Sequence, residues 1–179
     1  MKLLNSSIVS IVKCSWDSFS DFNEDGFYNI SEGDFFRFAA GAVIFVLDNG
    51  YEIGFSSLEN IASITVWLEK DDKGNKNEDY YEDDEELFLI KNTDDVYATE
   101  KERDLKGQKI KEIRILKGKP KNSKFDDLPN ETGLEITFEN GHVLVLSHNL
   151  IESPSSFAIA YQSEICESNL KQLTGVKII

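Results

Sequence analysis

The stretch VIFVLDNGYEIGFS, at residues 43–56, recurs in altered form as LEITFENGHVLVLS at residues 134–147. An alignment without gaps superposes Asn49 on Asn140 and Gly50 on Gly141. Asn-Gly between apolar or alternating runs is the strongest short-range signal for a β-hairpin, because both central residues of a type I′ turn need a positive φ. Each stretch is therefore predicted to be a β-hairpin with a type I′ turn at Asn-Gly.

The similarity extends to the segments on either side of the hairpins. Residues 7–12 and 109–114 precede the two hairpins, and residues 63–68 and 156–161 follow them; all four segments have the composition of strands. Two unrelated hairpins could resemble each other by chance, because hairpins are common. The recurrence of the outer strands in the same order favours an internal duplication instead.

The expected organisation is a single compact domain over residues 1–179. It consists of a first repeat at about 5–70, an acidic connection at 71–106 and a second repeat at about 107–165. The expected fold class is mainly β, or α+β with few short helices, with one or more antiparallel sheets built from the two repeated hairpin units. Whether the repeats form one sheet, a sandwich or a barrel is left open by the pattern.

Secondary structure outside the repeats is expected to be sparse. Residues 87–90 have the apolar pattern of a short buried strand. Some helix is expected at 32–42, and a short helix is expected at 164–173, with Gly175 as its stop.

The charge of the chain restricts the class of partner. Its 179 residues carry a net charge of −14, and 40% of them are hydrophobic, as a folded domain requires. Nucleic acids and anionic membranes repel such a surface, whereas a basic protein is attracted to it. Acidity could also serve only to keep the chain soluble.

Two cysteines, Cys14 and Cys166, lie far apart in sequence and are too few for a disulfide framework, and no residues have the spacing of metal ligands. No signal peptide or membrane-spanning run is evident, so we expect a cytoplasmic protein.

One segment fits the pattern of an EF-hand calcium loop. Its oxygen ligands would be Asp21, Asn23, Asp25 and Glu32, with Gly26 at the sharp turn. The residues before the loop are rich in serine and β-branched side chains, which suit a helix poorly. A calcium-binding module is therefore kept as an alternative to an ordinary acidic loop.

Other catalytic or metal sites are not indicated. His142 and His148 could share one face of a strand and bind zinc or act as a pH switch, but no third ligand is evident. No motif of a hydrolase, a phosphate-binding loop or a redox centre is present. We therefore expect a protein that is not an enzyme and has no cofactor, while an enzyme with an unrecognised carboxylate site stays open as a second alternative.

The acidic connection is the strongest candidate for binding a partner. Residues 69–86 hold ten acidic residues and three lysines, a net charge of −7. Tyrosines within this segment could add rigid contact area. The candidate partner-binding residues are Asp71, Asp72, Glu78, Asp79, Tyr80, Tyr81, Glu82, Asp83 and Asp84. A solvated loop is the alternative for this segment, and exposed strand edges are a second way to bind a partner.

The apolar strands around Asn-Gly, residues 107–113, 134–141 and 144–147 above all, resemble immunity proteins of bacterial contact-dependent growth inhibition systems. The resemblance covers most of the chain. It implies a cytoplasmic antitoxin that binds and neutralises a cognate toxin domain, often a basic nuclease. We expect the chain to be a monomer before it forms this complex. It implies no catalytic residues.

Overall fold

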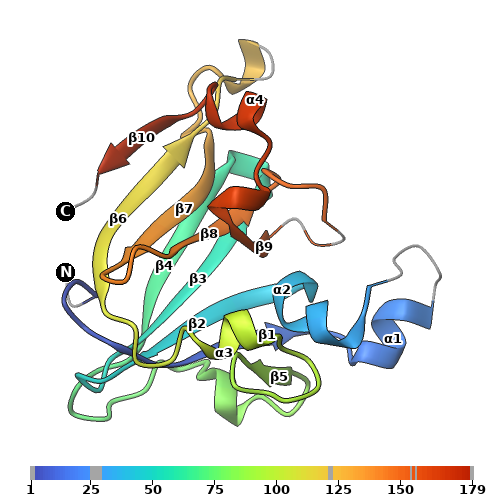
Figure 1. The fold of residues 1–179 in the computed structure, drawn as a ribbon, viewed down its shortest axis with the longest axis vertical. Coiled ribbons are helices and arrows are strands. Elements are labelled where there is room, and N and C mark those ends of the chain that lie inside the picture. The colour runs from blue at the N-terminus through green and yellow to red at the C-terminus, as the bar shows by residue number, and fades with distance from the viewer. Residues whose placement is uncertain (1–2, 25–29, 121–122, 154, 156, 178–179) are drawn as a thin grey trace.

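The chain folds into two antiparallel sheets of five strands each, with short helices in the connections (Figure 1). The computed structural model describes residues 3–24, 30–120, 123–153, 155 and 157–177. This architecture confirms the expected fold class, a mainly β domain with few short helices.

The two sheets have the same strand topology. Sheet 1 has the order β4-β3-β2-β1-β5 and sheet 2 the order β10-β6-β7-β8-β9, so reversing the second order matches the two repeats strand for strand. The strands of sheet 1 are β1 (Ile8–Ser15), β2 (Gly41–Leu47), β3 (Glu52–Leu58), β4 (Ser63–Lys70) and β5 (Phe88–Lys91). The strands of sheet 2 are β6 (Ile110–Lys117), β7 (Glu131–Phe138), β8 (Val143–His148), β9 (Phe157–Tyr161) and β10 (Thr174–Lys177).

The helices in the described part of the chain are short, and none is longer than six residues. The α-helices are α1 (Phe19–Glu24), α2 (Phe35–Phe38), α3 (Glu100–Arg103) and α4 (Glu167–Leu170). The 3-10 helices are η1 (Glu32–Asp34), η2 (Glu59–Ile61), η3 (Tyr81–Asp83), η4 (Ser123–Phe125) and η5 (Gln162–Glu164).

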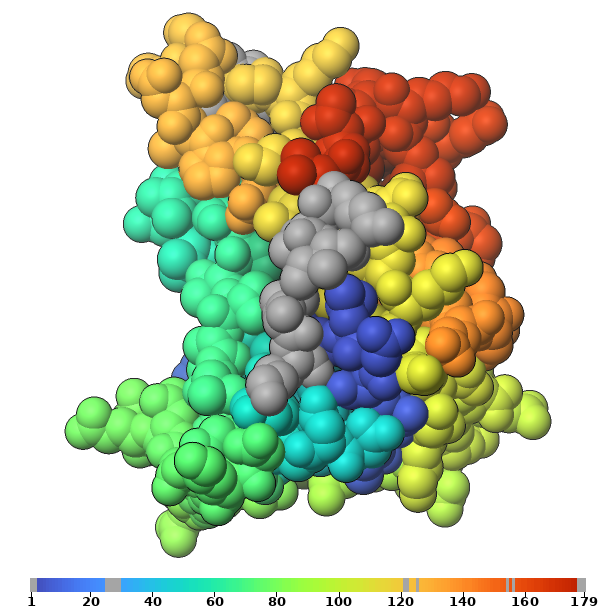
Figure 2. Space-filling model, turned by 90° about the vertical axis from the view of Figure 1, so that its left-hand side faces the viewer, coloured from blue at the N-terminus to red at the C-terminus, as the bar shows by residue number. Residues whose placement is uncertain are grey.

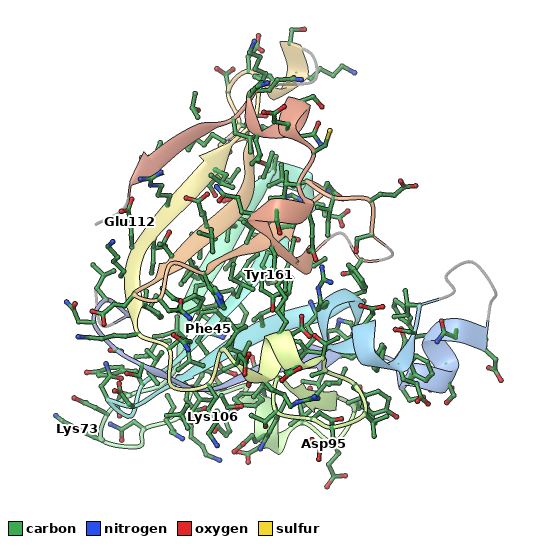
Figure 3. The ribbon with its side chains drawn as sticks, in the orientation of Figure 1. Phe45, Lys73, Asp95, Lys106, Glu112 and Tyr161 are labelled. Atoms are coloured by element: carbon green, nitrogen blue, oxygen red, sulfur yellow. The ribbon has the colours of Figure 1, made fainter. Side chains whose placement is uncertain are left out.

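One hydrophobic core lies between the inner faces of the two sheets. Phe45 of β2 lies in this core (Figure 3). It packs against Phe55 of β3 with ring centroids 5.0 Å apart, and both side chains are fully buried. Ile136 and Leu144 of sheet 2 belong to the same buried cluster. The sheets therefore stabilise each other, because each buries the apolar face that the other leaves uncovered.

Paired hydrogen bonds relate the repeats by a local twofold axis. The backbone N–H of Ile8 donates to the carbonyl oxygen of Gln108 at 2.9 Å, and the N–H of Ile110 donates to that of Ser6 at 3.0 Å. A twofold rotation exchanges these two bonds. The starts of β1 and β6 are thus paired at the axis.

The register of the strands repeats in detail. A bulge in β1 lies between Ile8 and Ser10, and the corresponding bulge in β6 lies between Ile110 and Glu112. Even the short fifth strands match, because β5 and β10 pair in the same way with the ends of β1 and β6. Bulges are specific features of a strand rather than defects, so their recurrence fits an internal duplication.

The hairpin turns differ from the predicted type. Positive φ is found at Gly50 (85°) and Gly141 (86°) but not at Asn49 or Asn140, so type I′ turns at Asn-Gly are wrong. The N–H of Gly50 donates to the carbonyl oxygen of Leu47 at 3.1 Å, which makes a type I turn followed by a left-handed glycine. The asparagine side chains explain the choice, because each accepts a hydrogen bond from the N–H two residues later.

The predictions for the segments outside the repeats are confirmed only in part. The short strand expected at 87–90 is confirmed as β5, and the helix allowed at 32–42 is present as η1 and α2. Strand β10 was not expected. The helix predicted at 164–173 reduces to η5 and α4, because the chain turns after Leu170 and then pairs with β6.

Connections of different length distinguish the two halves. Residues 16–40, between β1 and β2, hold α1, η1 and α2, whereas residues 118–130, between β6 and β7, are fewer and hold η4 alone among the described elements. Helix α2 packs on β9 of the other sheet. The half that lacks such a helix leaves strand β4 less covered than its counterpart.

Candidate functional site

The acidic segment, defined here as residues 71–86, is folded onto the outer face of sheet 1. Its two tyrosines are buried, with only 3% of Tyr80 and 4% of Tyr81 exposed. Their rings lie 4.9 Å apart and join a small apolar cluster that includes Val12 and Ile44. The segment projects from the lower part of the molecule in Figure 2, where it is drawn in green.

Two buried carboxylates of sheet 1 hold the acidic segment in place. The hydroxyl of Tyr80 donates to Glu52 at 2.9 Å, and Glu52 is also paired with Lys70. The backbone N–H of Tyr81 donates to Glu69 at 3.1 Å, and the indole N–H of Trp67 donates to the same carboxylate at 2.8 Å. Buried charges persist only when they are paired and hydrogen-bonded, so these contacts tie the segment to β3 and β4.

Burial of the tyrosines also fixes their protonation. Desolvation, followed by the hydrogen bond to Glu52, raises the pKa of Tyr80 well above its usual value. Desolvation, followed by the charges of Glu52 and Glu82, raises the pKa of Tyr81 likewise. Both hydroxyls therefore stay protonated and can donate to the carboxylates beside them.

The expectation that Tyr80 and Tyr81 offer contact area to a partner is wrong, because the structure uses both rings as anchors. Most of the acidic candidate residues, in contrast, are exposed to solvent. Six of the candidate residues have exposed side chains: Asp72, Glu78, Asp79, Glu82, Asp83 and Asp84.

The first turn of the segment is ordered by Asp71. Its carboxylate accepts hydrogen bonds from the side chain and the N–H of Asn75 and from the N–H of Lys73, and these bonds lower the pKa of Asp71. Lys73 points outward at the tip of this turn (Figure 3). Lys76 pairs with Asp83 at 2.9 Å and lies 4.0 Å from the ring centroid of Tyr80. The segment is therefore a fixed anionic surface rather than a loose loop.

The predicted calcium ligands are only partly described. Asp21 and Asn23 lie in helix α1, where Asp21 accepts a hydrogen bond from Ser18 at 2.6 Å. Glu32 begins η1, and Asp25 lies outside the described residues. The structure thus places the first two ligands on a helical turn rather than in a loop.

The two histidines do not share a strand face. His142 is exposed in the hairpin turn before β8, whereas His148 is buried at the end of β8, with its Nδ1 3.1 Å from the carbonyl oxygen of Glu131. Within the described ranges, no cluster of three or more His, Cys, Asp or Glu side chains could hold a metal ion. Cys14 is buried and Cys166 is exposed, and both thiols are free.

Two features of the structure were not predicted from the sequence. Lys13 is fully buried between the sheets, and its Nζ donates to the carbonyl oxygens of Gly41 at 3.0 Å and Phe157 at 2.8 Å. The second feature is the edge strand β4, where Val66 is 47% and Leu68 is 49% exposed. The alternation of β1, which puts Lys13 on the same face as Ile11, was a usable signal for the first; the exposure of β4 depends on tertiary packing.

No family model, curated protein or solved structure matches this chain. None of the helices in the described ranges has the length and apolar character needed to cross a lipid bilayer. We therefore infer the function of this chain from the geometry of its anionic surface and of the exposed strand β4.

Proposed function

We propose that the chain is a cytoplasmic immunity protein that binds a cationic toxin domain, such as a basic nuclease, and neutralises it by stoichiometric association. The observation that carries this proposal is the ordered acidic segment. Its exposed carboxylates are held on a folded base by Tyr80 and Tyr81, whose donors are directed inward to Glu52 and Glu69.

Fixing like charges side by side is unfavourable unless a partner neutralises them. Asp79, Glu85 and Glu86 are exposed and have no salt bridge among the described residues. A cationic surface would relieve their repulsion, and the entropy of ordering the segment has been spent before binding. Such a surface also steers association, so the on-rate should fall as salt is added.

The proposal predicts that a neighbouring gene encodes a large polypeptide with a basic C-terminal domain, and the test uses that domain as the partner. We expect a one-to-one complex that suppresses the toxic activity of that domain. Stopped-flow measurements at several salt concentrations should show an on-rate that falls steeply with salt and an off-rate that changes little.

A matched pair of variants assigns the steering to the acidic segment. The quadruple variant E78Q/D79N/E85Q/E86Q removes four exposed charges from the segment, and the control D95N/D126N/D127N/E152Q removes four exposed charges elsewhere. Both variants carry a net charge of −14 + 4 = −10. The first should slow association about tenfold or more at low salt and the control much less. Equal effects would assign steering to net charge alone, and a missing or non-inhibitory complex would refute the proposal.

A further inference from the structure

Equivalent strands of the two sheets are covered to different extents. The register of the outer hairpins aligns Val66 and Leu68 of β4 with Ile159 and Tyr161 of β9. Ile159 and Tyr161 are buried in the core, whereas Val66 and Leu68 are about half exposed. The difference therefore lies in what packs on each strand and not in the strands themselves.

Helix α2 is the element that covers β9. It comes from the longer connection of the first repeat and lies on the edge of sheet 2. Arg37 of α2 donates from its Nε to the carbonyl oxygen of Ile159 at 3.2 Å, and its guanidinium lies 5.5 Å from the ring centroid of Tyr161. The arginine thereby satisfies a backbone acceptor at the open edge of the sheet.

Strand β4 has an equivalent apolar face and open edge, but no helix in the described part of the chain packs on it as α2 packs on β9. It packs on β3 and on the start of β7. The N–H of Ile64 donates to the Glu131 carboxylate at 2.8 Å, so Ile64 directs its backbone groups away from β3. Because these directions alternate along a strand, Val66 and Leu68 also direct their N–H and C=O groups outward.

Acidic residues follow both of these strands. Glu164, five residues after Ile159, forms an ion pair with Arg37. Asp71 lies five residues after Val66, and the exposed Asp72 follows it. Hydrogen bonds from Asn75 lower the pKa of Asp71, which keeps its carboxylate ionised at neutral pH. A cationic segment that docks along β4 would approach these carboxylates at the end of the strand.

We propose that the inner face and open edge of β4 bind a short helical segment of the cationic partner, with apolar side chains on Val66 and Leu68 and an arginine on the Val66 carbonyl. This docking would repeat the packing of α2 on β9. It deepens the proposed function and depends on it. Charge complementarity favours a cationic occupant over a second copy of this chain, because two copies would each carry −14.

The experiment compares three single substitutions in the complex with the basic partner domain that the proposed function predicts. V66E and L68E each place a charge on β4, and V96E places one at a site that is 52% exposed in the connection after β5. All three add the same negative charge, so none should weaken long-range attraction to the partner. We expect V66E and L68E to raise the Kd at least ~30-fold, as at a binding hot spot, and V96E to change it less than about threefold.

Hydrogen exchange supplies a second readout on the unmodified protein. Complex formation should protect the amides of β4, and the protected segment of the partner should be helical and contain an arginine whose replacement by lysine weakens binding. If V66E or L68E does not fold, V66S and L68S replace them. The thermal unfolding of each free variant checks this beforehand.

Four outcomes would overturn the inference. A tight inhibitory complex with unchanged Kd for V66E and L68E would leave the proposed function standing and remove β4 from the interface. A partner segment that pairs with β4 as an added strand would exclude the helical occupant. Sedimentation showing that β4 joins two copies of this chain would assign the strand to self-association. If no complex forms at all, the proposed function fails and this inference fails with it.

Discussion

The Nζ atom of Lys13 lies 2.8 Å from the carbonyl oxygen of Phe157, so a buried amine joins β1 of sheet 1 to β9 of sheet 2. Its second acceptor is the carbonyl oxygen of Gly41. No carboxylate forms an ion pair with this amine among the described residues. Desolvation therefore dominates and lowers the pKa of Lys13 to about 7.

Replacing Lys13 by methionine should change how stability depends on pH. The folded-state pKa of about 7 lies below the ordinary value of 10.5, so between these values the unfolded chain holds a proton that the folded chain lacks. As the pH falls from 10.5 to 7, the free energy of unfolding of the wild type should drop by up to about 5 kcal/mol and then level off, whereas K13M should lack this change. Urea unfolding of the wild type and K13M at pH 6, 7.5 and 9 measures this.

The difference between the two proteins isolates the lysine, since every other titrating group is shared. Burial raises the pKa of the neighbouring Cys14 to about 12, which keeps that thiol protonated in the folded chain over the range tested. The stability of the wild type relative to K13M should rise by roughly 1.4 kcal/mol per pH unit above pH 7. Parallel pH profiles would show that the amine is not desolvated as described.

Removing one hydroxyl should loosen the acidic segment. Y80F deletes the hydroxyl whose single proton is shared between Glu52, at 2.9 Å, and Glu82, at 3.0 Å. Hydrogen bonds to charged groups contribute about 1.5–3 kcal/mol, so we expect a loss of that size in the free energy of unfolding. Y97F is the matched control, because the Tyr97 hydroxyl has no hydrogen-bond partner among the described residues. The ring would keep its contacts with Phe35 and Phe88. Equal losses for Y80F and Y97F would contradict the anchoring role.

The strands of both repeats could be predicted from the sequence, because the alternation of apolar and polar residues and the Asn-Gly pairs are local signals. It was insufficient for β10, whose few residues form a strand only because β6 offers an open edge. Local composition also predicts the acidic segment, but it places Tyr80 and Tyr81 at the surface, whereas the structure buries both. Their burial depends on Glu52 and Glu69, which lie on other strands, and local composition does not report such long-range hydrogen bonds.

Alanine at the third position of each hairpin loop should destabilise the fold by similar amounts. Gly50 and Gly141 have φ of 85° and 86°, a left-handed conformation that costs other residues about 1–2 kcal/mol. An added Cβ would meet only ordinary contacts at Gly50 and open space at Gly141, so backbone strain alone is expected for G50A and G141A. G33A serves as the control, because Gly33 does not have a positive φ and its Cβ would lie 3.7 Å from Thr99. A loss at only one hairpin would show that the two turns are not equivalent.

Gly54 should be required for the seating of Trp67, and G54A tests this. A Cβ at Gly54 would lie 2.2 Å from the Trp67 indole, so the ring must move. The corresponding position of the second repeat holds Val145, because the strand opposite it there carries the small Ala160. Displacement of the indole would remove the 2.8 Å hydrogen bond that Trp67 donates to buried Glu69.

The expected loss for G54A is about 1–3 kcal/mol from overpacking, with part of it due to the carboxylate left without a donor. Fluorescence in a W16F background reports Trp67 alone, because the chain has two tryptophans. The emission of G54A should shift to longer wavelength as the indole enters water, while G33A in the same background should leave the spectrum unchanged. An unshifted spectrum with unchanged stability would mean that β3 and β4 separate freely to admit the methyl group, and the tie between Trp67, Glu69 and the acidic segment would then be weaker than the contacts imply.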